Sequence, residues 1–304
     1  MAEISEKAER PLWRRIVDFP LVAMVIAVAV FVFAAQLAMW IEHALPAMPR
    51  NERTPINVVI DVVLQFAMYK LVTRRLGERP RDDLRWNGAL RNLGLGLVGG
   101  AVLFGIVTAA AAAAGVYSIT DCCRVGQLIR DLFEATILAG FAEELLFRGI
   151  LFRWIEEFAG SWAALILTSA LFGFVHIENP GATWFSSFAI AVEAGLLLGG
   201  AYMLTRSLWA PIGLHAAWNF TQGYVFDIPV SGVPEQGLVQ AKLAGPPLLS
   251  GGQFGLEASV LGLLVATAAG VGLVIIAVRR GEVMKPWWTQ RRQLSGSPMP
   301  DRVG

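Results

Sequence analysis

The sequence predicts an all-α, polytopic integral membrane protein with about eight transmembrane helices. Of its 304 residues, 55% are hydrophobic and only 16% are Asp, Glu, Lys or Arg. A soluble domain carries about 25% charged residues, so this chain has too few to cover a soluble surface. Apolar runs of about 20 residues, the length that spans a bilayer, recur along the chain. The net charge of +1 argues against nucleic-acid binding, and the abundance of apolar residues excludes disorder.

The first four predicted spans each have a distinguishing feature. Span one (20–41) is too long for the core of a secretory signal, and no small-residue cleavage site follows it, so we expect it to be retained. Span two (56–72) carries Asp61, and span three (93–117) contains a run of alanines. Span four (131–154) is unusually polar for a membrane helix.

The other four spans complete the predicted membrane domain. Span five (162–177) is short, and span six (183–205) is a full-length apolar run. Span seven (208–226) has Pro211 near its first turn, where a proline is tolerated. Span eight (255–278) precedes a basic C-terminal segment.

The distribution of basic residues predicts the orientation. With the N-terminus in the cytoplasm, the cytoplasmic segments hold 19 of the 25 Lys and Arg residues, the opposite side holds five, and Arg148 lies within span four. This asymmetry is what the positive-inside rule requires. It predicts a cytoplasmic tail (1–19), a transmembrane domain (20–278) and a second cytoplasmic tail (279–304). The Ala- and Arg-rich composition favours a bacterial plasma membrane.

Two local patterns, the regularly spaced glycines and the adjacent cysteines, are interpreted as structural, and no function is assigned to them. Glycines that recur every four residues, such as Gly96 and Gly100, predict close approach of helix backbones. The cysteines Cys122 and Cys123 are adjacent and cannot join distant parts of the fold. No disulfide framework is therefore expected.

Span four contains three ionisable residues that need an explanation. Each ionisable group at the centre of a span costs about 2.5–3.5 kcal/mol on insertion scales. Glu144 and Arg148 are four residues apart and share a helix face, so we expect them to pair. Glu143 lies about 100° around the helix and has no obvious local partner. Intramembrane charges of this kind usually mark a functional site.

Histidine and asparagine residues in two other spans extend this set. His176 ends span five, and His215 and Asn219 lie four residues apart in span seven. If the three spans converge, Glu143, the two histidines and Asn219 form a polar pocket inside the membrane. Asp61 and Glu193 are further intramembrane acids, for which we expect at most a supporting role. His43 lies at the outer end of span one and is expected to be solvated.

These residue types are suited to the activation of water. The chain has no Gly-x-Ser-x-Gly nucleophile motif and no His-Glu-x-x-His zinc motif. A carboxylate in an apolar site can act as a general base near neutral pH, and histidine and asparagine can stabilise an oxyanion. The same histidines, with Glu143, could instead hold a zinc ion. Either the metal-free groups or the zinc site could activate water to hydrolyse a peptide bond, and neither requires a covalent intermediate.

At these residues the chain resembles the CPBP intramembrane proteases, also called CAAX-processing or abortive-infection-type proteases. The family motif Glu-Glu-x-x-x-Arg is matched by Glu143, Glu144 and Arg148. The motif Phe-x-x-x-His is matched by Phe172 and His176, and the motif His-x-x-x-Asn by His215 and Asn219. The resemblance covers about residues 130–225. All three motifs occur in order, each on a predicted span.

The resemblance implies an intramembrane endopeptidase that acts on membrane-anchored or lipidated substrates. It implies Glu143 as the general base with His176, and His215 with Asn219 as the oxyanion donors. Glu144 and Arg148 would orient Glu143. Family members have been described both as metalloproteases and as glutamate-dependent enzymes. Zinc held by Glu143, His176 and His215 therefore stays open, and we favour the metal-free mechanism because Asn219 suits an oxyanion site better than a zinc shell.

Two other function classes also fit the sequence. A proton-coupled transporter would use intramembrane acids and histidines as a relay. A non-catalytic membrane scaffold or immunity protein would retain the motifs without hydrolysis. The transporter predicts proton-coupled flux in liposomes that survives Asn219→Ala, and the scaffold predicts that Glu143→Ala leaves its phenotype intact.

Overall fold

The computed structural model describes residues 11–77, 81–123 and 125–289, and this part of the chain is almost entirely helical. Six of its helices are long and apolar enough to cross a membrane. They are α3 (Pro20–Ala44), α4 (Arg50–Arg75), α5 (Ala89–Ala113), α9 (Ser161–Val175) with the short η3 (His176–Glu178), α10 (Trp184–Thr205) and α13 (Val260–Arg279). The prediction of an all-α, polytopic membrane protein is confirmed.

The other two predicted spans, four and seven, are helical but irregular. Residues 128–159 run through α6 (Leu128–Arg130), η1 (Asp131–Leu138), α7 (Ala139–Glu144), η2 (Leu145–Phe152) and α8 (Arg153–Ala159), in which η1 and η2 are π-helical. Span seven comprises α11 (Trp209–Phe220) and the π-helical η4 (Thr221–Val225). Neither is a long, apolar α-helix, so the count of eight spans stays a prediction. π-Helical turns inside helices are frequent at functional sites.

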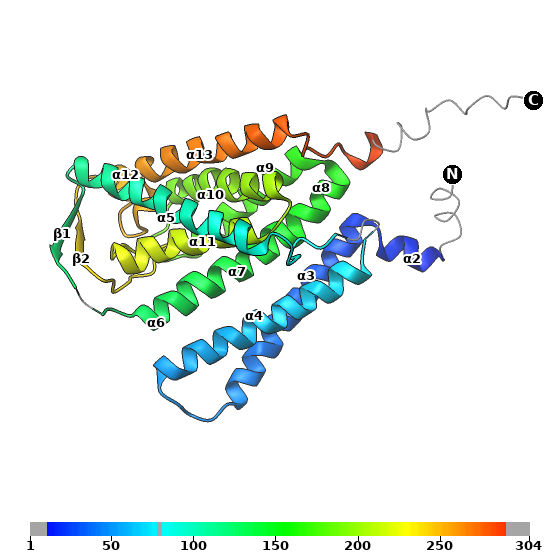
Figure 1. Cartoon of the computed structure of the whole chain (residues 1–304), viewed down its shortest axis with the longest axis horizontal. Coiled ribbons are helices and arrows are strands. Elements are labelled where there is room, and N and C mark those ends of the chain that lie inside the picture. Colours follow the sequence, from blue (N-terminus) through cyan, green and yellow to red (C-terminus); the bar gives the residue numbers. More distant parts are fainter. Residues whose placement is uncertain (1–10, 78–80, 124, 290–304) are drawn as a thin grey trace, which may run out of the picture.

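The helices form two groups on either side of the run 128–159 (Figure 1). On one side α5, α9, α10, α11 and α13 pack together, with the most extensive contacts between α5 and α11 and between α10 and α13. On the other side α3 and α4 form a hairpin that contacts the rest of the bundle chiefly through η1, η2 and α8. The polar span four is therefore covered by protein on two sides.

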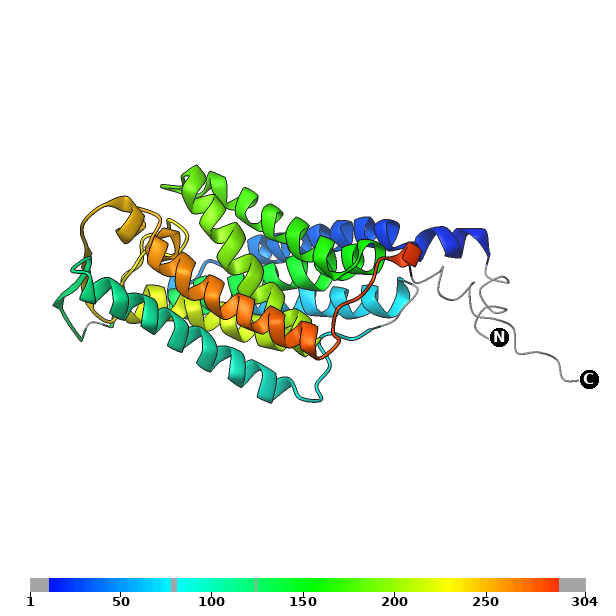
Figure 2. The ribbon, with the colours of Figure 1, turned by 90° about the horizontal axis from the view of Figure 1, so that it is seen from above.

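One end of the bundle carries both described chain ends. Phe19, which precedes α3, packs edge-to-face on Trp287 with 6.3 Å between ring centroids. Phe158 of α8 packs in the same way on Trp288 at 5.8 Å. Figure 2 shows α2 (Leu12–Val17) and the segment after α13 at the same end of the molecule. Both described ends therefore lie at one end of the bundle, and their placement in the cytoplasm stays a prediction.

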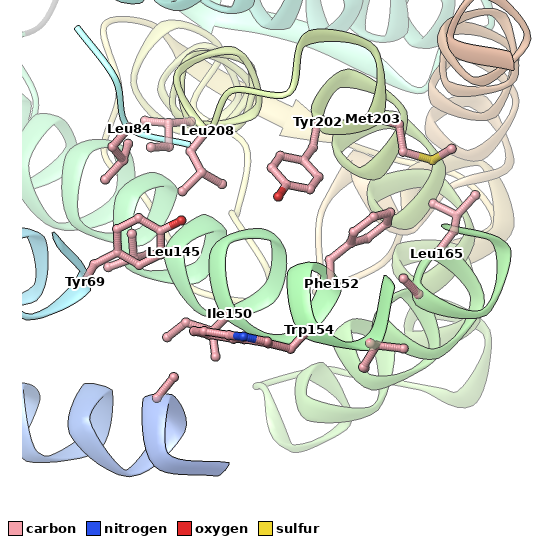
Figure 3. Packing of buried hydrophobic residues seen from close by; sticks show 14 of the residues in the cluster. Tyr69, Leu84, Leu145, Ile150, Phe152, Trp154, Leu165, Tyr202, Met203 and Leu208 are labelled. Atoms are coloured by element: carbon pink, nitrogen blue, oxygen red, sulfur yellow. The ribbon is translucent and has the colours of Figure 1, made fainter. Parts of the chain in front are cut away.

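A buried polar cluster lies next to the largest apolar core, which Figure 3 shows around Tyr69, Phe152, Trp154 and Tyr202. Asp83 is fully buried and accepts hydrogen bonds from Tyr69 at 3.4 Å, from Tyr202 at 3.2 Å and from Arg153 at 3.2 Å. These partners come from α4, α10 and α8. One carboxylate therefore joins three helices.

Glycines set the distance between α5 and α11, as predicted for Gly96 and Gly100. A methyl group at Gly100 would collide with the backbone of Leu214, and one at Gly96 with the backbone of Ala210. Gly213 of α11 faces the backbone of Leu93 in the same way. The close approach fixes the position of α11, the helix that carries His215 and Asn219.

The opposite end of the bundle is closed by a two-stranded antiparallel sheet, β1 (Tyr117–Asp121) and β2 (Gln240–Leu243). Nearby, Glu235 accepts a hydrogen bond from Arg130 at 3.3 Å and is also hydrogen-bonded to Asp131. Burial, followed by the hydrogen bond and charge of Asp131 and by the charge of Glu134, raises the pKa of Glu235 from 4.5 to about 8 against the opposing effect of Arg130. This carboxyl is therefore protonated in the folded protein over a wide pH range.

A pH-dependent stability is expected from Glu235. Between pH 4.5 and about 8 the folded state holds one proton more than the unfolded state at this group, so its contribution to stability falls as the pH rises through that window. We expect the melting temperature of Glu235→Gln, relative to wild type, to increase steadily from pH 4.5 to 8. The exposed Glu52→Gln should show no such trend. A pH-independent difference for Glu235→Gln would contradict the assignment.

Candidate intramembrane active site

Three of the predicted site residues line one cavity. His176 from η3 and His215 and Asn219 from α11 surround a space of about 40 Å³, measured by where the centre of a water molecule fits. About 10–15 Å³ of such space holds one water, so this cavity accommodates a few. The predicted convergence of spans five and seven is therefore found in the structure.

Glu144 lies directly behind His215. One oxygen, Oε1, accepts a hydrogen bond from Arg148 Nη1 at 2.8 Å and faces His215 Nδ1 at 3.0 Å. The side chains of Glu144 and Arg148 are 0% and 1% exposed. The predicted Glu144–Arg148 pair is present, and the contact to His215 adds a third member to it. Burying a charge is costly unless it is paired, and here each charge has a partner.

Arg148 links span four to two other helices. Its Nη2 donates to the backbone carbonyl of Ala194 in α10 at 2.9 Å. Its guanidinium lies over the ring of Phe172 in α9, 4.9 Å from the ring centroid. The same ring lies 4.6 Å from the ring of His176. The ion pair, the aromatic residue of the second motif and the catalytic candidate His176 thus form one continuous set of contacts.

The backbone around His176 fixes the tautomer of its ring. Nδ1 lies 2.6 Å from the carbonyl oxygen of Phe172, one turn back along the helix. A carbonyl oxygen only accepts hydrogen bonds, so Nδ1 carries the proton and Nε2 is the acceptor in the neutral ring. Nε2 is therefore the nitrogen that can hold or deprotonate a water.

The hydrogen-bonding pattern of His215 differs from that of His176, because Nδ1 of His215 faces the carboxylate of Glu144. With Nδ1–H directed at Glu144, Nε2 donates a hydrogen bond only when the ring is an imidazolium. Glu144 favours that cation through its charge. The two histidines of the cavity are thus set up for different roles, one as an acceptor and one as a donor.

The positions of Asn219 and Glu143 differ in part from the predicted pocket: Asn219 lines the cavity but also bonds to the backbone, and Glu143 does not line the cavity. The amide nitrogen of Asn219 donates to the carbonyl of Ala135 at 2.9 Å, which leaves its second N–H for a ligand. Glu143 lies outside the lining of the cavity. Its Oε2 is buried without a hydrogen-bond partner, and its charge acts on both Arg148 and His215. A buried carboxylate oxygen without a partner indicates a water or substrate contact.

Two acids in the cavity wall were not assigned a direct role from the sequence. Glu193 of α10, expected to have at most a supporting role, lines the cavity. Glu257 of η5 (Leu256–Ala258) does so as well, and only its position at the start of span eight distinguishes it in the sequence. Asp61 of α4 is instead hydrogen-bonded to Glu42 of α3 and lies away from the cavity.

The predicted metal ligands do not come together as a shell. Among the residues that the structure describes, no group of three or more His, Cys, Asp or Glu side chains is arranged to hold a metal ion. Glu143 lies outside the cavity that the two histidines share, and Nδ1 of each histidine is already engaged. A catalytic zinc site needs three protein ligands around one point. The side chains as arranged do not fit a zinc ion.

Comparison with known proteins connects this geometry to a family. Residues 126–221 match the family model described as Type II CAAX prenyl endopeptidase Rce1-like. The resemblance to CAAX-processing proteases is confirmed. We call residues 126–221 the Rce1-like segment. It contains all six predicted site residues, from Glu143 to Asn219, whereas Glu257 lies outside it.

A curated bacterial protein is also similar to the chain. The Bacillus subtilis (strain 168) protein named "Putative membrane peptidase YdiL" is 25% identical over 174 residues, which is 53% of this chain and 67% of that protein. No solved structure matches the chain significantly. The Rce1-like segment and this relative together support a membrane peptidase.

Proposed function

We propose that the chain is an intramembrane endopeptidase that hydrolyses peptide bonds of membrane-anchored or lipidated substrates. One observation carries the proposal. A cavity that accommodates a few waters is lined by His176, His215 and Asn219, and Glu144, held by Arg148, lies behind His215. A transporter would need a path across the membrane, whereas this cavity suits water activation at a single point. Leucine and aromatic side chains form much of its lining, and a lining of low polarity strengthens electrostatic interactions with the reacting groups.

The proposed first step is attack by water on the scissile carbonyl carbon. Nε2 of the neutral His176 accepts a hydrogen bond from the water and positions it. Glu143 takes the proton that the water loses as its oxygen bonds to carbon. Glu143 lies on the last turn of α7, outside the cavity lining, so the proposal requires it to approach the water when substrate binds; catalytic hydrogen bonds often form only in that complex. The same proton then passes to the leaving amine as the carbon–nitrogen bond breaks.

The negative charge that develops on the carbonyl oxygen needs donors. His215 as an imidazolium donates from Nε2, and Asn219 donates from the N–H that Ala135 does not use. Glu144 stabilises the imidazolium, and Arg148 holds Glu144 in place at 2.8 Å. Arg148 and Glu144 are therefore positioning residues. They act on the reaction through His215.

The sequence composition and the distribution of basic residues support a proposal for the membrane and for the orientation of the chain. We propose a bacterial plasma membrane because the composition is rich in Ala and Arg. We propose that both tails are cytoplasmic because 19 of the 25 basic residues lie in the segments that this orientation places inside. The two described chain ends lie at the same end of the bundle, which supports this orientation. Protein substrates anchored in that membrane would reach the cavity from within the bilayer.

The decisive experiment is cleavage of a defined substrate pool. Purified protein in detergent or liposomes is incubated with membrane-anchored peptides in water enriched in ¹⁸O, and the products are analysed by mass spectrometry. Wild type should release peptides that carry one ¹⁸O atom in the new carboxyl group, and Glu143→Gln should not. Proton flux in the same liposomes without any cleavage would favour the transporter class instead.

A metal-free mechanism makes a separate prediction. We expect active, purified protein to contain well under one zinc ion per chain, because the donors do not converge. A chelator should leave the rate unchanged. The measurement is elemental analysis of wild type and His215→Ala beside a peptidase assay. Stoichiometric zinc in active wild type that disappears in His215→Ala, together with inhibition by chelator, would overturn the metal-free mechanism.

A further inference from the structure

The cavity wall contains two acids that the proposed hydrolysis does not use. Glu193 and Glu257 are 3% and 4% exposed, and both line the cavity that holds His176 and His215. They come from α10 and η5, which are in contact. Within the described residues, no Lys or Arg side chain lines this cavity, and the cationic group proposed for it is the imidazolium of His215, whose charge acts on Glu257. The negative charge of Glu257 acts directly on Glu193.

The two acids differ in how they are held. Glu257 Oε1 accepts a hydrogen bond from the backbone N–H of Ser231, and Gln222 also donates to this carboxylate. Glu193 Oε2 is buried and has no hydrogen-bond partner. A buried polar atom without a partner costs free energy, which a donor bound in the cavity would recover. Glu193 therefore presents an unused acceptor to whatever occupies the cavity.

The rest of the wall is apolar and aromatic. Leu197, Leu198 and Leu214 line the cavity together with the rings of Phe172 and Trp218. Such a wall suits the methylene groups of a long side chain, and an aromatic face attracts a cation. A cation that enters beside the two carboxyls also favours their ionised form. The combination of apolar wall and acidic pair matches an alkyl chain with a cationic tip.

We propose that Glu193 and Glu257 form a subsite that recognises a cationic substrate side chain, Lys or Arg, next to the scissile bond. The proposal rests on the peptidase function, because the cavity also holds the proposed catalytic groups. The subsite disfavours a free C-terminal carboxylate at the same position, since like charges repel in a buried place. Glu193 lies inside the Rce1-like segment and Glu257 lies outside it, so the subsite combines the matched segment with a part of the chain that the family model does not cover.

Binding is tested first, without any cleavage. The melting temperature of the purified protein is measured with n-butylammonium chloride, with n-butanol and with sodium butyrate at matched ionic strength. The ammonium should raise the melting temperature of wild type by about 2 °C or more, and the alcohol and the butyrate should not. Glu193→Gln and Glu257→Gln should each lose this shift, and the exposed Glu52→Gln should keep it. If n-butylammonium and n-butanol change the melting temperature of wild type equally, the subsite is overturned by the wild-type protein alone.

Specificity is tested next with matched peptides. Three membrane-anchored peptides differ only in Lys, norleucine or Glu at one position beside the cleaved bond. Wild type should cleave the Lys peptide at least about tenfold faster than the norleucine peptide, consistent with one desolvated ionic contact. In Glu193→Gln that ratio should fall toward one, whatever the absolute rates. In Glu52→Gln it should not change.

The two tests separate the failure of the subsite from the failure of the peptidase. Cleavage of all three peptides at similar rates overturns the subsite and leaves the peptidase standing. Stabilisation by butylammonium in a protein that cleaves nothing overturns the peptidase, and it supports a cation site in the cavity. A preference for the Glu peptide overturns the subsite outright.

Discussion

Glu143→Gln is expected to reduce the rate of peptide cleavage by a factor of about 10²–10⁴, the usual contribution of a general base. The substitution keeps the volume of the side chain and one acceptor oxygen, but it removes the basicity that the proposed step needs. Glu143 has a buried oxygen without a hydrogen-bond partner among the described residues and lies outside the Glu144–Arg148 ion pair, so folding should be little affected. The measurement is the initial rate on a cleaved membrane-anchored peptide, beside the melting temperature and the detergent-solubilised yield.

The matched control is Glu52→Gln, which makes the same chemical change at an exposed position. It should leave rate, yield and melting temperature near the wild-type values. A Glu143→Gln protein that is folded and retains full activity would remove Glu143 from the mechanism. The base would then have to be another group that lines the cavity, and His176, Glu193 and Glu257 are the candidates.

Glu144→Gln is expected to act on stability first. Glu144 Oε1 contacts both Arg148 and His215, and the ion pair is almost completely buried. Removing one partner of a buried pair leaves an uncompensated charge and costs about 3–5 kcal/mol. We expect a fall in the melting temperature on the order of 10 °C and a lower yield of folded protein.

A double-mutant cycle separates this effect from a general loss of packing. Glu144→Gln combined with Arg148→Gln removes both charges, so the double variant should recover part of the stability that Glu144→Gln loses. Activity should stay low in both variants, because His215 lacks the carboxylate that holds it. Additive losses of stability in the cycle would show that the pair carries no mutual stabilisation.

Much of the fold follows from local patterns in the sequence. Apolar runs of about 20 residues located the membrane helices because the bilayer sets their length. The spacing of Glu144 and Arg148 predicted their contact, since residues four apart meet on a helix. The glycines at positions 96 and 100 predicted a close helix approach, and it occurs between α5 and α11. Each of these rules refers to neighbours along the chain.

Contacts between distant segments were not predictable in this way. His215 and Glu144 are 71 residues apart, and nothing local indicates that Nδ1 of one faces Oε1 of the other. The cavity position of Glu257 depends on how η5 follows α12 (Pro247–Ser250). The π-helical stretches η1 and η2 were also missed, because hydrophobic periodicity does not distinguish them from α-helix over eight residues. The sequence motif placed Glu143 in the site, yet the structure places it just outside the cavity.

One part of the cavity wall, which includes Glu257 and Ala266, is synthesised after all the residues proposed for catalysis. A ribosome completes every proposed catalytic residue by position 219, before it adds η5 and α13. Until α13 enters the membrane, the groups proposed to activate water lack one wall of their cavity. A chain interrupted at that stage carries every residue proposed for catalysis but an incomplete cavity. Under the proposed mechanism, hydrolysis should therefore begin only after α13 has been inserted.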